Sequence, residues 1–207
     1  HDLIAHWVRH DARYLLDTWG RPRFTIPCSL VAWAGDAQFG FKLARGLSSL
    51  MSAATAWLAF CIARRLNLRH AWAAVPLLFL QPLFARLSST TLTETPLSLY
   101  FALATWLLLS GRPAWSAAIM ALGPLTRDEA VVILPLWALA MSRQNARWWA
   151  YPLLVWAAIA HNLVSGLWLG VWPALRWVQP AGADFYGAGT PLTFIPRLLH
   201  ASGPLIV

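Results

Sequence analysis

Residues 88–95, SSTTLTET, form a polar cluster inside an otherwise apolar part of the sequence. The cluster holds six hydroxyl side chains and one carboxylate, that of Glu94. A carboxylate at the edge of a hydrocarbon layer is costly unless it faces protein or water, which makes Glu94 a candidate functional group. Two interpretations stay open here: a polar hairpin at the mouth of a membrane cavity, or an ordinary loop between two spans.

A second charged cluster, Thr126-Arg127-Asp128-Glu129, follows a later apolar run. A carboxylate that faces a cavity can act as a general base, and the rigid fork of an arginine can hold a phosphate. Arg127 and Glu129 are therefore candidate site residues together with Glu94. The competing interpretation is that Glu94 and Arg127 only pair with each other or extend to the membrane surface.

The composition is that of an integral membrane protein. Of the 207 residues, 58% are hydrophobic and 12% are charged, about half the charged fraction of a soluble domain. The mean hydropathy is +0.53, and the fourteen tryptophans fit the preference of this side chain for membrane surfaces. We therefore expect an all-α fold, a polytopic bundle of about five to seven transmembrane helices.

The net charge of +8 does not indicate a nucleic-acid partner. The sixteen basic residues occur in ones and twos along the chain, and membrane topology together with anionic headgroups accounts for them. The two cysteines, Cys28 and Cys61, are not expected to form a disulfide, because one lies in a polar loop and the other in an apolar run.

The apolar runs predict a back-and-forth course through the membrane. We expect a first span at 41–63, a return at 71–87 that includes Pro76 and Pro82, and further segments at 96–109, 114–125, 131–141 and 151–169. Positive charge places the turn with Arg64, Arg65 and Arg69 in the cytoplasm. Residues 1–42, 88–95 and 126–129 then converge on the outer side.

The domain organisation follows from these spans. Residues 1–42 are expected to form a first extracytoplasmic loop with short interfacial helices, and residues 43–169 the transmembrane helices. Residues 170–197 would form another outer loop, and residues 198–207 would begin a further span. Because the chain starts in a polar region and stops in an apolar one, we expect it to be a fragment of a longer membrane protein.

The helix that starts near Pro96 is expected to have a threonine cap. Thr93 or Thr95 could supply it, since proline is well tolerated in the first helical turn. The positive end of that helix would then point at an outer cavity, where it would stabilise an anion.

Several motifs of soluble enzymes do not occur in the sequence. It has no glycine-rich phosphate loop, no HExxH, no GxSxG and no CxxC. It also has no DxD, so nothing indicates a metal-held nucleotide sugar. We expect no cofactor and leave a divalent metal open. An enzyme with this sequence would take a lipid-linked donor.

Five short motifs resemble those of one family of membrane enzymes. They are His1-Asp2, Gly20-Arg21-Pro22-Arg23-Phe24, Lys42-Leu43-Ala44-Arg45 with Ser48-Ser49 after it, Leu92-Thr93-Glu94, and Pro124-Leu125-Thr126-Arg127-Asp128-Glu129. In this order they resemble the GT-C superfamily of membrane glycosyltransferases, and within it the protein-mannosyltransferase-like branch (family 39) with its bacterial members. Two motifs depart from the pattern: the family's Asp-Glu pair is His1-Asp2 here, and its Pro-Glu-Gly is Asp128-Glu129-Ala130.

The resemblance implies inverting transfer of a sugar from a polyprenyl-phosphate donor to an acceptor hydroxyl, at the outer face of a bacterial cell membrane. It implies that Asp2 is the catalytic base and that Arg45 or Arg127 stabilises the polyprenyl phosphate as it leaves. Glu94 and Glu129 would line the cavity and orient the arginine or the sugar. The partners would be the lipid-linked sugar, a glycan, lipid or protein acceptor, and the lipid bilayer, with no nucleic acid.

The alternative is a non-catalytic polytopic membrane protein, either a transporter or a scaffold in envelope biogenesis. A transporter would place charges near the bilayer midplane and often has repeated halves. Here the charges lie at the predicted outer edge and no repeat occurs in the sequence. The scaffold is therefore the stronger of these two alternatives.

Overall fold

The computed structural model describes residue 16, residue 27 and residues 37–177 of the chain. The predicted catalytic Asp2, and most of the predicted outer loops at 1–42 and 170–197, lie outside these residues. Every regular element in the described part is helical, and no strand occurs there. The all-α prediction is therefore confirmed for this part of the chain.

The α-helices of the described part differ in length from six residues to twenty-nine. The α-helices are α3 (Ala37–Arg65), α4 (Ala74–Leu80), α5 (Pro82–Leu87), α6 (Glu94–Leu109), α7 (Pro113–Met120), α8 (Ile133–Arg143) and α9 (Trp156–Leu169). The 3₁₀ helices are η2 (Ala71–Ala73), η3 (Gly123–Leu125), η4 (Asp128–Val132), η5 (Trp148–Ala150), η6 (Pro152–Leu154) and η7 (Pro173–Trp177).

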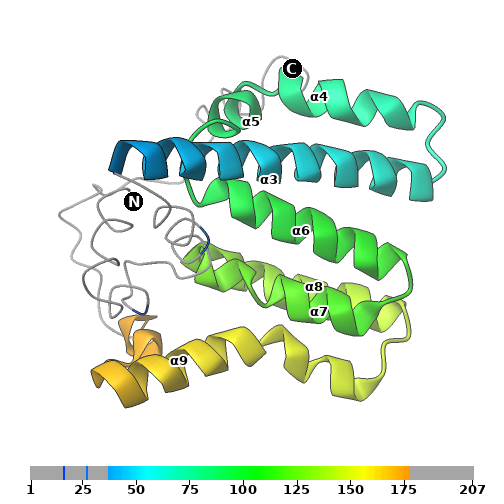
Figure 1. Ribbon diagram of the computed structural model, residues 1–207. Coiled ribbons are helices and arrows are strands. Elements are labelled where there is room, and N and C mark those ends of the chain that lie inside the picture. Colours follow the sequence, from blue (N-terminus) through cyan, green and yellow to red (C-terminus); the bar gives the residue numbers. More distant parts are fainter. Residues whose placement is uncertain (1–15, 17–26, 28–36, 178–207) are drawn as a thin grey trace, which may run out of the picture.

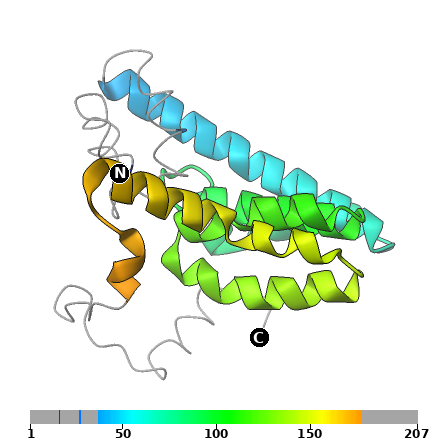
Figure 2. The same ribbon diagram turned by 90° about the horizontal axis from the view of Figure 1, so that it is seen from below.

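The helices run back and forth side by side, so that the turns between them gather at two ends of the bundle (Figure 1). The turns at 66–70, 110–112 and 144–147 lie at one end, which we call the arginine end. The turns at 88–93 and 126–128 lie at the opposite end, which we call the Glu94 end. α3 lies between α4 and α6, and α6 also packs against α7. Figure 2 shows α8 on the far side of α6 and α7 from α3.

α3 turns small side chains inward and large ones outward. A spacing of four places its small buried residues along one face of the helix: Gly40, Ala44, Ser48, Ser52 and Ala56. On its other faces the large side chains of Leu50 and Trp57 are exposed. Helices in membranes pack in this way, because small residues let two backbones approach while lipid covers the large side chains.

A buried hydroxyl joins α6, α7 and α8. Ser116 on α7 is fully buried, and its Oγ donates to the carbonyl of Ala104 on α6 at 2.7 Å. The same Oγ accepts a hydrogen bond from Nε1 of Trp137 on α8 at 2.9 Å. The apolar core lies around this network and includes Leu108, Ala117, Met120, Leu134, Met141 and Leu154.

The predicted span at 71–87 is wrong as a single helix. Gln81 has an extended backbone, with φ −71° and ψ 117°, between α4 and α5. A residue before proline avoids the helical conformation because the proline ring clashes with it, so Pro82 begins a new helix. The predicted full span at 151–169 likewise divides at Val155, since the segment Trp148–Leu154 and α9 meet at 47°.

Length and composition allow one helix of the described part to cross a membrane, namely Gln38–Arg65 within α3, with a mean hydropathy of 1.5. The bent pair Trp148–Leu154 and Trp156–Leu169 makes a second if both parts form one span. The apolar helices Ala71–Leu80, Glu94–Leu109 and Pro113–Leu125 are shorter. The polytopic part of the fold prediction therefore stays a prediction.

Candidate functional site

Two threonines near the turn at 88–93 bond to the last turn of α5. Thr90 Oγ1 and Thr95 Oγ1 both donate to the carbonyl of Leu87, at 3.0 and 3.2 Å. Carbonyls at the end of a helix lack partners within that helix, so nearby hydroxyls satisfy them. Thr93 occupies the N-cap position of α6, but its backbone is helical and its side chain makes no cap hydrogen bond. The predicted cap by Thr93 or Thr95 is therefore wrong.

α3 holds the start of the same turn. Nε of Arg45 donates to the carbonyl of Ser89 at 3.0 Å, and its guanidinium lies over the ring of Phe41, 5.8 Å from the centroid. Ser52 Oγ donates to the carbonyl of Ser88 at 3.5 Å. Arg45 thus has a structural contact through Nε, and its two terminal nitrogens have no hydrogen-bond partner among the described residues.

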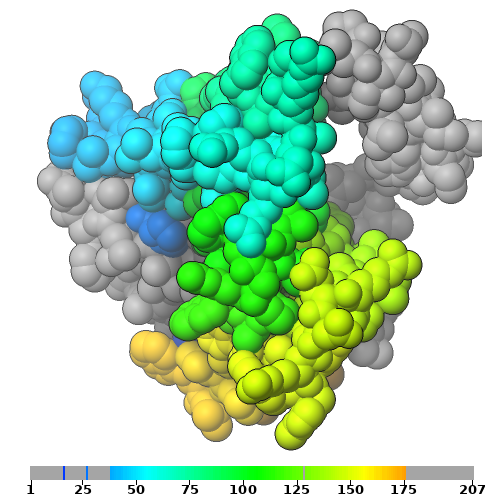
Figure 3. Space-filling model, turned by 90° about the vertical axis from the view of Figure 1, so that its right-hand side faces the viewer, coloured from blue at the N-terminus to red at the C-terminus, as the bar shows by residue number. Residues whose placement is uncertain are grey.

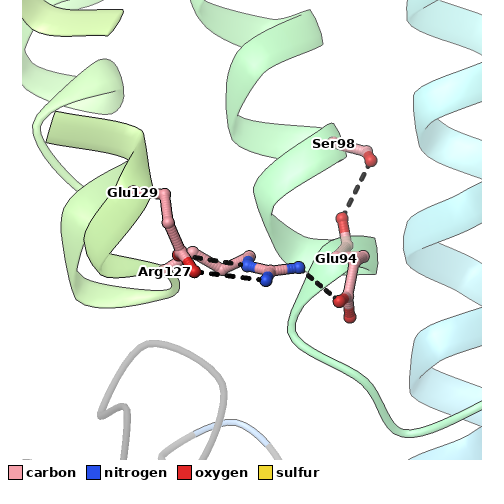
Figure 4. Close-up of polar contacts among 4 residues, drawn as sticks. All are labelled: Glu94, Ser98, Arg127 and Glu129. Atoms are coloured by element: carbon pink, nitrogen blue, oxygen red, sulfur yellow. Dashed lines mark hydrogen bonds and ion pairs between the residues drawn. The ribbon is translucent and has the colours of Figure 1, made fainter. Parts of the chain in front are cut away.

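Arg127 lies between the carboxylates of Glu94 and Glu129 (Figure 4). Its Nη1 is 2.5 Å from Oε1 of Glu94, and its Nε and Nη2 are each 3.4 Å from one oxygen of Glu129. The side chains of Arg127 and Glu94 are 34% and 33% exposed, whereas that of Glu129 is 69% exposed. Glu94 therefore holds the arginine more closely than Glu129 does.

One carboxylate oxygen of this cluster has unused hydrogen-bonding capacity. Oε2 of Glu94 is buried and has no hydrogen-bond partner in the described part of the chain. Buried polar atoms are nearly always hydrogen-bonded in folded proteins. A hydroxyl or a water molecule that donates to Oε2 would complete the coordination of this carboxylate.

Tight packing against α6 positions the turn that carries Arg127. A Cβ at Gly123 would lie 3.5 Å from Leu97 Cδ1 on α6, which is an ordinary van der Waals contact, and 3.1 Å from Cε at the flexible end of Met120. Thr126 is fully buried, and its Oγ1 donates to the carbonyl of Gly123. Because Leu97 lies about one helical turn beyond Glu94, this packing brings Arg127 opposite the start of α6.

The two ends of the bundle differ in charge. All acidic residues of the described part belong to the Glu94 end: Glu94, Asp128 and Glu129. The arginine end has no acidic residue in the described ranges, and its cations are Arg64, Arg65, Arg69, Arg112, Arg143 and Arg147. Such an excess of arginine is typical of the cytoplasmic side of a membrane protein.

The structure brings together three of the predicted site residues, Glu94, Arg127 and Glu129. Of the three clusters that were predicted to converge, those at 88–95 and 126–129 contact each other through this ion pair, and a direct pair of Glu94 with Arg127 is also what the competing interpretation stated. Arg45 reaches the beginning of the same turn, and Asp2 lies outside the described residues. The bond from Ser52 to the turn was not predicted, although its place in the four-residue series of small side chains is visible in the sequence.

Comparisons of the chain with protein-family models, with curated proteins and with solved structures gave no match. Within the ranges that the structure describes, no group of three or more His, Cys, Asp or Glu side chains could hold a metal ion. The candidate site therefore rests on its own geometry, an arginine oriented by one close and one looser carboxylate.

Proposed function

We propose that this protein is a multi-pass membrane glycosyltransferase of the GT-C type. It transfers a sugar from a polyprenyl-phosphate donor to an acceptor hydroxyl, with inversion, at the outer face of the membrane. The observation that carries the proposal is the cluster of Arg127 with Glu94 and Glu129, at the end of the bundle opposite to the arginine end. An arginine at the outer end can bind a phosphate that is linked to a lipid.

The exposed apolar side chains of the bundle support a multi-pass membrane protein. Several helices carry large apolar residues that are mostly exposed, among them Leu50, Leu80, Val132, Leu136, Ile159 and Leu167. Proteins in water rarely expose so much apolar surface without a partner to cover it. Lipid chains are the partner that fits side chains spread over so many helices.

The looser carboxylate gives the donor phosphate a way to reach Arg127. Glu129 is the more exposed partner, and its contacts with the guanidinium are 3.4 Å long. A phosphate would replace Glu129, while Glu94 keeps the arginine oriented. When the bond between the sugar C1 and the phosphate oxygen breaks, negative charge grows on the phosphate, and the guanidinium stabilises that charge.

The acceptor hydroxyl forms the new bond to C1 and gives up its proton to a carboxylate. The resemblance of the sequence to the family assigns this base to Asp2. Within the described residues, the buried Oε2 of Glu94 can accept a hydrogen bond from a hydroxyl of the donor sugar. Glu94 would then hold both the arginine and the sugar.

The test is release of polyprenyl phosphate by the purified protein in nanodiscs supplied with a polyprenyl-phosphate sugar and membrane extract as acceptor. Arg127→Gln is expected to lower the rate by about 100-fold or more, the usual loss when one group that stabilises a developing charge is removed. Arg86→Gln is the matched control, because Arg86 lies on α5, is exposed and has no side-chain partner in the described part. Wild-type turnover by Arg127→Gln, or by Asp2→Asn, would show that the role given to that residue is wrong.

A scaffold without catalytic activity is the second candidate, and one observation favours it. Arg127 already has two carboxylate partners, so the cluster can be a structural link between α6 and the turn before η4. A scaffold would release no polyprenyl phosphate from any donor. It would still lose stability when Arg127 is replaced.

A further inference from the structure

A pocket of about 480 Å³ opens at the arginine end, on the opposite side of the bundle from the Glu94 cluster. It lies where the segment that begins α7 meets the turn between α8 and η5. Figure 3 looks onto this end and shows the two segments, green and yellow-green, next to each other. Its polar and aromatic lining residues are Arg112, Trp115, Gln144, Asn145, Arg147 and Trp149.

The lining of the pocket is cationic, and its guanidinium N–H donors have no acceptor among the described residues. Arg112 and Arg147 are exposed, and neither guanidinium has a hydrogen-bond or ion-pair partner among the described residues. The pocket lining contains no acidic residue in that part of the chain. Two arginines without carboxylates leave a strong positive potential, which favours an anion with several acceptor oxygens.

Backbone donors add to this potential. The N–H groups of Ala114 and Trp115, in the first turn of α7, have no backbone acceptor, and both residues line the pocket. Free N–H groups at the start of a helix bind phosphate oxygens. The first turn of α7 and the two arginines therefore offer two kinds of donor to one ligand, backbone N–H groups and guanidinium N–H groups.

The turns fix the backbone on which both arginines lie. Gly111, with φ 71°, closes the turn that follows α6, and the N–H of Arg112 bonds back to the carbonyl of Leu107 at 3.0 Å. Asn145, with φ 52°, closes the turn that follows α8 in the same manner, and the N–H of Ala146 bonds back to the carbonyl of Met141 at 3.1 Å. Such left-handed helix ends are closed by backbone hydrogen bonds, so each arginine follows a defined turn.

The aromatic residues of the pocket indicate which kind of anion would bind there. Trp115 and Trp149 line the pocket and are exposed, and Trp148 beside them is exposed as well. Tryptophan prefers the headgroup level of a bilayer, and basic pockets between helices on the cytoplasmic side bind anionic lipid headgroups. We propose that this pocket binds the phosphodiester headgroup of an anionic phospholipid between Arg112 and Arg147. The proposal requires insertion in a membrane, but not sugar transfer.

The test compares two variants that lose the same charge at the same end. Arg112→Gln/Arg147→Gln removes both pocket arginines. Arg69→Gln/Arg143→Gln is the control, because these two arginines are also exposed, make no side-chain bond to a described residue and do not line the pocket. Native mass spectrometry of the protein in nanodiscs, with phosphatidylglycerol titrated into phosphatidylcholine, measures how tightly lipid is retained.

The pocket variant is expected to retain phosphatidylglycerol about thirtyfold less tightly than the wild type, from two lost arginine contacts. The control is expected to stay within a few-fold of the wild type. Equal losses in both variants would show that only the general positive charge attracts lipid. Circular dichroism confirms the fold, and Arg112→Lys/Arg147→Lys, which keeps the charge, should recover part of the binding.

A second arm separates a lipid headgroup from free phosphate. Inorganic phosphate, added to the protein in pure phosphatidylcholine, is expected to give no stabilisation that depends on Arg112 and Arg147. If phosphate alone stabilised the wild type as strongly as phosphatidylglycerol, the pocket would be a site for soluble phosphate and the lipid assignment would fail. The release of polyprenyl phosphate is measured separately, so a negative result there leaves this test intact.

Discussion

Removing the charge of Arg127 is expected to destabilise the protein more than removing the charge of Glu94. In Glu94→Gln, the arginine keeps Glu129, with its 3.4 Å contacts. In Arg127→Gln, two carboxylates lose the cation that they share, and the buried Oε2 of Glu94 loses the positive charge that offsets its burial. An unpaired, partly buried charge costs more than a missing partner at a surface pair.

The magnitudes follow from the geometry of the pair. Two unit charges with centres about 4 Å apart attract by roughly 4 kcal/mol at an effective dielectric constant of 20. Since about a third of each side chain is exposed, desolvation and solvent screening reduce the net value of the pair to about 1 kcal/mol. Glu94→Gln should therefore cost about 1 kcal/mol of unfolding free energy. Arg127→Gln should cost about 2 kcal/mol, because repulsion between the two carboxylates adds to the loss.

The assay is a double-mutant cycle, with reversible unfolding in mixed micelles followed by far-ultraviolet circular dichroism. Glu94→Gln/Arg127→Gln is expected to be about 1 kcal/mol more stable than the sum of the single changes predicts. The coupling should shrink at high salt. Arg86→Gln, the exposed control on α5, should change stability by less than about 0.5 kcal/mol.

Two outcomes would refute this reasoning. If Glu94→Gln costs as much as Arg127→Gln, then Glu129 does not share the arginine as the distances indicate. If the single changes are additive, then Glu94 and Arg127 do not stabilise each other in the folded protein. Measured beside the release of polyprenyl phosphate, the cycle also separates the two candidate functions. If the cluster is only a structural link, its variants lose stability and no activity is involved. If Arg127 is a site residue, its variant loses turnover while the protein remains folded.

Two further predictions concern the packing that supports the site. Ser48→Leu is expected to cost about 1–3 kcal/mol, because it overpacks the small-residue face of α3, whereas Ser49→Leu at the exposed neighbouring position should be nearly neutral in the same unfolding assay. Equal losses from the two changes would contradict the inward orientation of that face. Ser116→Ala is expected to cost about 1–2 kcal/mol, because the indole N–H of Trp137 loses its acceptor. Trp137→Phe should then cost less in the Ser116→Ala background than in the wild type, and identical costs would contradict the network.

Proline shows how far the sequence alone could predict the helices. Pro76 and Pro82 were both expected inside one span, but Pro82 begins α5 while Pro76 lies in the first turn of α4. Both positions are ones where a helix has no N–H bond to lose. The apolar runs could predict that helices form in this region. They could not predict that the chain breaks at Gln81, because the choice between a kink and a break depends on which neighbours satisfy the freed carbonyls.

The candidate site also has features that the sequence predicts and features that it does not predict. The types and order of Glu94, Arg127 and Glu129 are properties of the sequence, and the alternation of apolar runs is enough to predict that their turns meet at one end. The roles of the threonines could not be predicted, because a hydroxyl near a helix start can bond either forward to that helix or back to the preceding one. In the tertiary structure, the hydroxyl of Thr95 donates a hydrogen bond back to the carbonyl of Leu87.

The sequence by itself determines that the described part of the chain is helical and rich in apolar side chains. It also determines that acidic residues and the arginine-rich turns alternate along this part, so that they fall at opposite ends of the helix bundle. These properties follow from composition and spacing, which act locally along the chain. Only the tertiary structure decides that Arg127 contacts Glu94 across thirty-three positions of sequence. That contact depends on the packing of the turn that carries Arg127 against α6, where Gly123 lies beside Leu97, and this packing is decided by how whole helices lie against each other.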